Sequence, residues 1–233
     1  MRKLMVLIAF VLTISAVAHA DTVWLTFENV DPKNISTDGK YYVYPYNFAI
    51  TPGSSSYVAP TGTPSLTSLI CDDYHDQVFL TNPAEYWKAN VYTGSDIYTY
   101  GQMPKVAGGG LQPITKKAYE DAAWLFLQLS GPNDSNAAII NETIWAIFDS
   151  TTPYNSLVST EFALAELNSS STDLSQVVLY TPISDTQSIP NQPPQEFFGR
   201  APTTVPEPSS LLLLGSGLLG FCFKLRRKAL KNY

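Results

Sequence analysis

The chain contains very little cysteine and histidine. Its 233 residues include two cysteines, Cys71 and Cys222, and two histidines, His19 and His75. Because Cys222 lies in an apolar run near the C-terminus, the rest of the chain has a single cysteine and can form no internal disulfide. This excludes a small disulfide-stapled scaffold, so stability must come from a packed apolar core.

Basic residues are also scarce away from the two ends of the chain. There are 14 Lys and Arg residues against 20 Asp and Glu residues, which gives a net charge of −6. Arg2 and Lys3 lie at the start, and a basic group follows Phe223. The sequence between them is therefore acidic and has no basic cluster that could follow a phosphate backbone. We expect no nucleic-acid partner.

The first 20 residues have the build of a secretory signal peptide. Arg2 and Lys3 give a positive start, an apolar stretch runs from Leu4 to Val17, and Ala18-His19-Ala20 is a small-x-small ending. This order of parts predicts cleavage before Asp21 and export of the remainder.

The apolar pattern between residues 21 and 183 predicts an α+β body. Alternating or β-branched segments indicate strands at residues 23–30, 41–51, 65–73 and 176–183. Apolar residues at helical spacing indicate two helices separated by Gly131-Pro132-Asn133, and a third helix from Thr160 to Leu167. The short connection favours an antiparallel helical hairpin. We therefore expect a β-rich barrel or sandwich with this hairpin packed on it.

Proline dominates the next segment. Seven prolines fall between Pro182 and Pro208, among Ser, Thr, Gln and Asn. Such a segment buries little apolar surface, so residues 184–204 are predicted to be an extended spacer.

The last part of the chain, residues 205–230, has three parts in a fixed order. Val205, Pro206, Glu207 and Pro208 come first, an apolar run of 15 residues from Ser209 to Phe223 follows, and a basic flank closes it. As a single hydrophobic helix, this run would be about 22 Å long at 1.5 Å per residue, somewhat short for a bilayer core of about 30 Å. The basic flank, which favours a cytoplasmic C-terminus, consists of Lys224, Arg226, Arg227 and Lys228.

This tripartite ending resembles the PEP-CTERM sorting signal of Gram-negative bacteria, which is also labelled the ice-binding protein C-terminal domain. The resemblance implies that the membrane protease exosortase recognises Pro206-Glu207-Pro208 and removes the helix. It further implies transient residence in the inner membrane, followed by release to the cell surface or to an extracellular polysaccharide matrix. Exosortase, the membrane and extracellular polysaccharide are the partners expected on this basis.

The densest group of chemically capable side chains lies just after the third predicted strand. It consists of Cys71, Asp72, Asp73, His75 and Asp76. The carboxylates and the imidazole are plausible metal ligands, but no second His or Cys group at ligand spacing supports a metal site. A Cys71–His75 nucleophilic pair is a further alternative, although such pairs usually come from distant segments. The remaining alternative is that Cys71 is a buried, unreactive thiol without a chemical role.

The same cysteine also carries a second resemblance, to the thioester domains of bacterial surface adhesins. In these domains a Cys thiol and a Gln side chain form an internal thioester that captures an amine. Cys71 and Asp73 match the first element, and alignment on Trp145 places the Gln position at Asn141, beside Glu142. Because the glutamine is absent, we expect the architecture without the reactive bond.

The many aromatic side chains of the chain suggest a third interpretation, in which aromatic faces stack on sugar rings. The alternative is that these residues simply reflect the usual aromatic content of β-strands. They are Tyr41, Tyr42, Tyr44, Tyr46, Trp87, Tyr92, Tyr98 and Tyr100. The two tryptophans Trp124 and Trp145 are expected to pack in the core between the helices. Taken together, the sequence predicts a non-enzymatic exported protein without cofactor or resident metal, in a structural or adhesive role at the cell surface or in the matrix.

Overall fold

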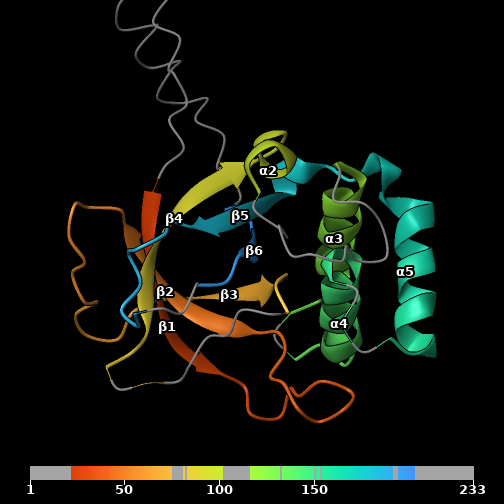
Figure 1. The fold of residues 1–233 in the computed structure, drawn as a ribbon, viewed down its shortest axis with the longest axis horizontal. Coiled ribbons are helices and arrows are strands. Elements are labelled where there is room, and N and C mark those ends of the chain that lie inside the picture. Colours follow the sequence, from red (N-terminus) through yellow and green to blue (C-terminus); the bar gives the residue numbers. More distant parts are fainter. Residues whose placement is uncertain are drawn as a thin grey trace, which may run out of the picture. The chain divides into compact units, whose positions relative to one another are not determined.

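A computed structural model describes residues 22–74, 81, 83–101, 116–131, 133–149, 151–152, 154–190 and 194–202. Six antiparallel strands in this part of the chain form a closed barrel in the order β1-β2-β3-β6-β5-β4 (Figure 1). The strands are β1 (Thr22–Val30), β2 (Tyr46–Pro52), β3 (Leu66–Cys71), β4 (Tyr86–Thr93), β5 (Val177–Pro182) and β6 (Phe197–Arg200).

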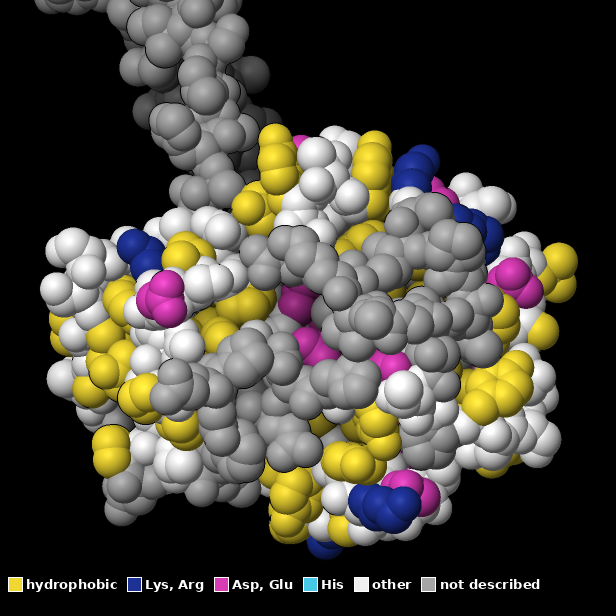
Figure 2. All heavy atoms as spheres, viewed as in Figure 1, with side chains coloured by type: hydrophobic (Ala, Val, Ile, Leu, Met, Phe, Trp, Pro, Cys, Tyr) yellow, Lys and Arg dark blue, Asp and Glu magenta, His cyan; other side chains and the backbone are white. Residues whose placement is uncertain are grey.

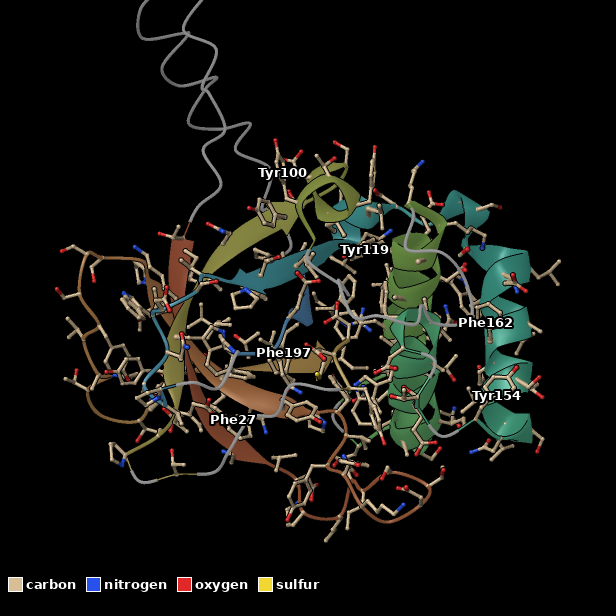
Figure 3. The ribbon with its side chains drawn as sticks, in the orientation of Figure 1. Phe27, Tyr100, Tyr119, Tyr154, Phe162 and Phe197 are labelled. Carbon is tan, nitrogen blue, oxygen red and sulfur yellow. The ribbon has the colours of Figure 1, made fainter. Side chains whose placement is uncertain are left out.

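Aromatic rings fill the barrel interior. The Phe48 ring on β2 lies 4.9 Å from the Phe197 ring on β6 and 5.5 Å from the Trp87 ring on β4. Neither β6 nor β4 is a neighbour of β2 in the sheet, so these contacts cross the inside of the barrel. Figure 3 shows Phe197 and Phe27 lying within the ring of strands. Closure removes the open sheet edges that would otherwise expose unpaired backbone groups.

A second core lies between the outer face of the barrel and the helices. Ile70, Leu179 and Phe198 point outward from β3, β5 and β6, because they alternate with the inward residues. They meet Phe126 and Ile144 in one buried cluster. The helices are α2 (Asp96–Tyr100), α3 (Lys116–Gln128), α4 (Ala137–Phe148) and α5 (Ser156–Asn168), followed by two short 3-10 turns at Ser169–Ser171 and Leu174–Gln176. In Figure 1, α3 and α4 lie between the barrel and α5.

The predicted α+β class with a β-rich barrel and packed helices is confirmed for the described residues. Strands predicted at 23–30, 65–73 and 176–183 correspond to β1, β3 and β5, and the three predicted helices correspond to α3, α4 and α5. The second predicted strand was placed too early. It begins at Tyr46, directly after Pro45, rather than at residue 41.

The prediction that the body ends near residue 183 is wrong. β6 pairs with β3 and with β5, so Phe197–Arg200 close the barrel although they lie inside the predicted spacer. The preceding segment also contacts β4, because the backbone N–H of Ser188 donates to the Tyr86 carbonyl at 2.8 Å. The described residues from Thr22 to Arg200 therefore belong to one compact unit. The high proline content of this segment led to the prediction of a spacer and hid the pattern of a short strand, whose two phenylalanines are fully buried.

Several predictions fall outside the described residues. They are the signal peptide at 1–20, the Pro-Glu-Pro segment, the hydrophobic helix at 209–223 and the basic flank at 224–228. In the part of the chain that is described, none of the helices combines the length and the apolar character needed to cross a membrane.

Candidate functional site

Cys71 is the last residue of β3 and its side chain is completely buried. The thiol sits in a tight turn made by its own chain. Sγ–H donates to the Asp73 carbonyl oxygen at 2.9 Å, and the Asp73 backbone N–H lies 3.3 Å from Sγ as a donor. The free thiol is therefore engaged on both its donor and its acceptor side.

The surroundings of the thiol keep it protonated. Burial is the main cause that raises the pKa of Cys71 well above its usual value, and the negative charges of Asp73 and Asp72 act in the same direction. The Asp73 backbone N–H and the Trp145 side chain lower the pKa, but by less. Because the thiolate is the nucleophile, a buried thiol with a raised pKa is poorly reactive.

Asn141, on α4, is the residue that the thioester resemblance aligned with glutamine. It lies beside Cys71, and its side-chain amide forms hydrogen bonds with two backbone groups. Nδ2 donates to the Cys71 carbonyl at 2.8 Å, and Oδ1 accepts from the Tyr44 backbone N–H at 2.9 Å. The side chain is fully buried and links α4 to the end of β3 and to the segment that enters β2.

Glu142, the next residue on α4, also holds the backbone of a distant segment. Its carboxylate accepts from the backbone N–H of Thr37, and it accepts from the Thr37 hydroxyl at 2.7 Å. Asn155, at the start of α5, donates to the same hydroxyl at 3.3 Å. Glu142 therefore fastens the loop between β1 and β2 to the helices.

The acidic group after β3 divides in the structure. Asp72 is fully buried, whereas Asp73 is partly exposed, and His75 and Asp76 lie outside the described residues. Within the described ranges, His, Cys, Asp and Glu side chains form no set of three or more that could hold a metal ion. Glu196, just before β6, is the charged residue that acts most strongly on Asp72, and it was not predicted from the sequence. These residues are 124 positions apart, and only the β3–β6 pairing brings them together.

An aromatic group covers the turn at Cys71. The rings of Tyr41 and Tyr74 are 5.1 Å apart, and Trp145 lies 5.4 Å from Tyr74 and 6.3 Å from Tyr41. Trp124 is partly buried and packs against the helical core, as predicted. Trp145 is buried too, but its ring contacts are with Tyr41 and Tyr74 rather than with the core between the helices.

The aromatic residues considered for sugar stacking differ in exposure, and Tyr41 and Tyr92 are partly buried. Tyr44, Tyr46 and Trp87 are buried in the cores, whereas Tyr42, Tyr98 and Tyr100 are exposed. Basic side chains of the described residues do not gather into a large patch on the face shown in Figure 2, and several lie beside an acidic side chain.

Comparison with known proteins identifies the end of the chain. Residues 204–228 match the PEP-CTERM protein-sorting motif, which covers the predicted Pro-Glu-Pro segment, the apolar run and the basic flank. No curated protein and no solved structure matches the chain. The motif indicates an exported protein that exosortase sorts through the cell envelope. The chain is a PEP-CTERM sorting-domain-containing protein.

Proposed function

We propose that the barrel and its helices form a non-enzymatic component of the cell surface or the extracellular matrix, with a structural or adhesive role. One observation carries the proposal. The polar side chains singled out around Cys71 serve as internal braces, because Asn141 and Glu142 both bind backbone groups of distant segments. We therefore regard the barrel and its helices as a rigid unit, and the sorting motif directs its export.

Delivery in this proposal follows the sorting signal. Exosortase recognises Pro206-Glu207-Pro208 at the inner membrane of a Gram-negative cell and removes the helix, and the body is then released to the surface or into the polysaccharide matrix. Extracellular polysaccharide is a candidate partner for the exposed tyrosines Tyr42, Tyr98 and Tyr100, because aromatic faces stack on sugar rings.

Replacing Glu207 with Ala tests the delivery step. We expect most of the variant to remain in the membrane fraction with its tail attached, because the central charged residue of the recognised tripeptide is lost. Immunoblots of membrane, surface and polysaccharide fractions, with intact mass, would measure this. Ser209→Ala, just outside the tripeptide, is the matched control and should be released like the wild type. Normal release of Glu207→Ala would refute recognition through Pro-Glu-Pro.

A second candidate function is covalent adhesion through an internal thioester at Cys71. The contact between Cys71 and Asn141 favours it, since it places the thiol-bearing residue and an amide side chain together across 70 positions. Attack of Cys71 Sγ on the Asn141 side-chain carbonyl carbon would form a thioester and release the amide nitrogen as ammonia. An amine could then attack this thioester, forming a new amide and freeing the thiol. The Asn141 amide would first have to give up its two backbone hydrogen bonds.

Mass and thiol measurements distinguish the two functions. In the exported protein carrying Cys222→Ser, Cys71 is the only thiol. We expect an unmodified mass, and a thiol that reacts with a disulfide reagent only after denaturation, since the group is buried and its pKa is raised. Additional Cys71→Ala should remove the reaction. A mass deficit of about 17 Da would instead establish the thioester, because one ammonia is lost when the Cys71 thiol is acylated by the Asn141 side chain.

A further inference from the structure

A pair of buried carboxyl groups joins the two strands that complete the barrel. Asp72 directly follows β3 and Glu196 directly precedes β6. Cys71 is paired with Phe197, and the Asp72 backbone N–H contacts the Glu196 carbonyl at 3.5 Å, so these two residues continue the β3–β6 ladder. Side chains directly opposite on antiparallel strands lie on the same face and touch. The exposed fractions are 0% for Asp72 and 2% for Glu196.

The neighbours that the contacts of the described residues identify around this pair are acidic or neutral. Asp73 and Glu196 are the charged groups that act most strongly on Asp72. From β5, the Thr181 hydroxyl donates to Glu196 Oε2 at 2.7 Å. On β4, burial is the main cause that raises the pKa of Tyr92, followed by Tyr100 and then by the charge of Glu196.

The charged side chains of the helices that cover this side of the barrel have other partners. Asp121 on α3 is paired with Lys117, and Glu142 on α4 binds Thr37. Arg200 lies at the opposite end of β6, where it donates to the Leu129 carbonyl at 2.5 Å. None of these contacts supplies a positive charge to Asp72 and Glu196.

Two carboxylates in contact inside a protein cannot both remain ionised. A single proton held between them changes repulsion into a hydrogen bond from a carboxylic acid to a carboxylate, which is one of the stronger kinds. Burial is the main cause that raises the pKa of Asp72 well above its usual value, followed by the charges of Glu196 and Asp73. Both carboxylate oxygens of Asp72 are buried without a hydrogen-bond donor among the described residues.

We propose that Asp72 and Glu196 form a protonation-dependent clasp that holds β6 against β3 and weakens as the pH rises. β6 is the last strand of the barrel, and its final residue, Arg200, precedes the sorting motif by only four positions. The clasp therefore controls how firmly the barrel retains the strand that leads into the motif.

The direction of the pH dependence follows from linkage. A carboxyl whose pKa is raised on folding binds more protons in the folded than in the unfolded state. Its contribution to stability is fully present below the unfolded pKa, about 3.9 for Asp, and is lost as the pH rises through the folded value. For one proton, the equilibrium constant for unfolding rises up to about tenfold per pH unit within this window. A salt-bridged carboxyl would give the opposite sign.

The test is chemical denaturation of the exported protein between pH 5 and pH 9. We expect the free energy of unfolding of the wild type to fall with rising pH. In Asp72→Asn this free energy should change less steeply with pH and be larger than that of the wild type at pH 9, because a neutral amide needs no proton. Asp38→Asn is the matched control. Asp38 has a lowered pKa, chiefly from its hydrogen bond with Ser36, so its removal should leave the clasp-dependent slope in place. If Asp72→Asn does not fold, Glu196→Gln replaces it.

Two further measurements make the outcome specific. Hydrogen exchange, corrected for intrinsic rates, should show protection at Phe197–Arg200 falling with pH in the wild type and not in Asp72→Asn. An unchanged slope in both Asp72→Asn and Glu196→Gln would overturn the proposal. Stabilisation of the wild type at pH 9 by calcium chloride, absent in Asp72→Asn, would also overturn it, because the pair would then be a cation site.

Discussion

A chain that ends at Ile183 is expected not to fold, whereas one that ends at Pro202 is expected to unfold cooperatively like the full protein. The shorter chain lacks β6, so β3 and β5 lose their common partner and the barrel is left open. It also loses Phe197 from the barrel interior and Phe198 from the helical core, and both are fully buried. Removing a buried Phe costs about 3 to 5 kcal/mol, so the two together approach the total stability of about 5 to 15 kcal/mol of an ordinary domain.

The single change Phe197→Ala isolates the interior part of this effect. We expect a loss of about 3 to 5 kcal/mol in the free energy of unfolding, because the ring contacts Phe48 at 4.9 Å and Trp87 at 6.1 Å and leaves a cavity that the closed barrel cannot collapse. Phe162→Ala on α5 is the matched control. This ring is only partly buried (Figure 3), so its removal should cost clearly less.

Urea denaturation followed by tryptophan fluorescence measures these variants, and circular dichroism reports whether the truncated chains retain structure. A chain ending at Ile183 with the same midpoint as the one ending at Pro202 would contradict the role of β6. It would restore the boundary that composition alone predicted.

The error at residue 183 shows what a composition-based boundary misses. Proline content between Pro182 and Pro208 predicts a segment poor in regular structure, yet Phe197–Arg200 form a strand within its described part. Their burial depends on two long-range partners, β3 and β5, that no local pattern reveals. β4 was also missed, although its apolar residues Trp87, Ala89 and Val91 alternate with the polar residues Lys88 and Asn90.

The candidate site was predictable in part. The thioester resemblance correctly placed Cys71 near Asn141, because it carried information about a strand end and a helix meeting in space. Charge and spacing near Cys71 predicted an acidic group but not its arrangement. Glu196 is the charged residue that acts most strongly on Asp72, whereas Cys71 acts on Tyr46, and neighbouring residues of a strand point to opposite faces.

Replacing Asn141 with Ala is expected to destabilise the protein by about 2 to 6 kcal/mol, because two buried backbone groups lose their partners at about 1 to 3 kcal/mol each. These groups are the Tyr44 N–H and the Cys71 carbonyl, and both residues are buried. Asn168→Ala is the matched control. Asn168 also lies on a helix and donates to a backbone carbonyl, that of Leu164, but at an exposed position, so its loss should cost within about 0.5 kcal/mol.

Asn141→Asp separates the two hydrogen bonds. At neutral pH an aspartate can still accept from the Tyr44 N–H, but it cannot donate to the Cys71 carbonyl and places a buried charge beside it. We therefore expect a loss at least as large as in Asn141→Ala at pH 7. Stability should partly return at low pH, because protonation restores a donor. Urea midpoints of the three variants at pH 5 and pH 7 measure this. A cost for Asn141→Ala no greater than that for Asn168→Ala would show that the amide does not brace the strand end, and the argument for a structural rather than a reactive Asn141 would fail with it.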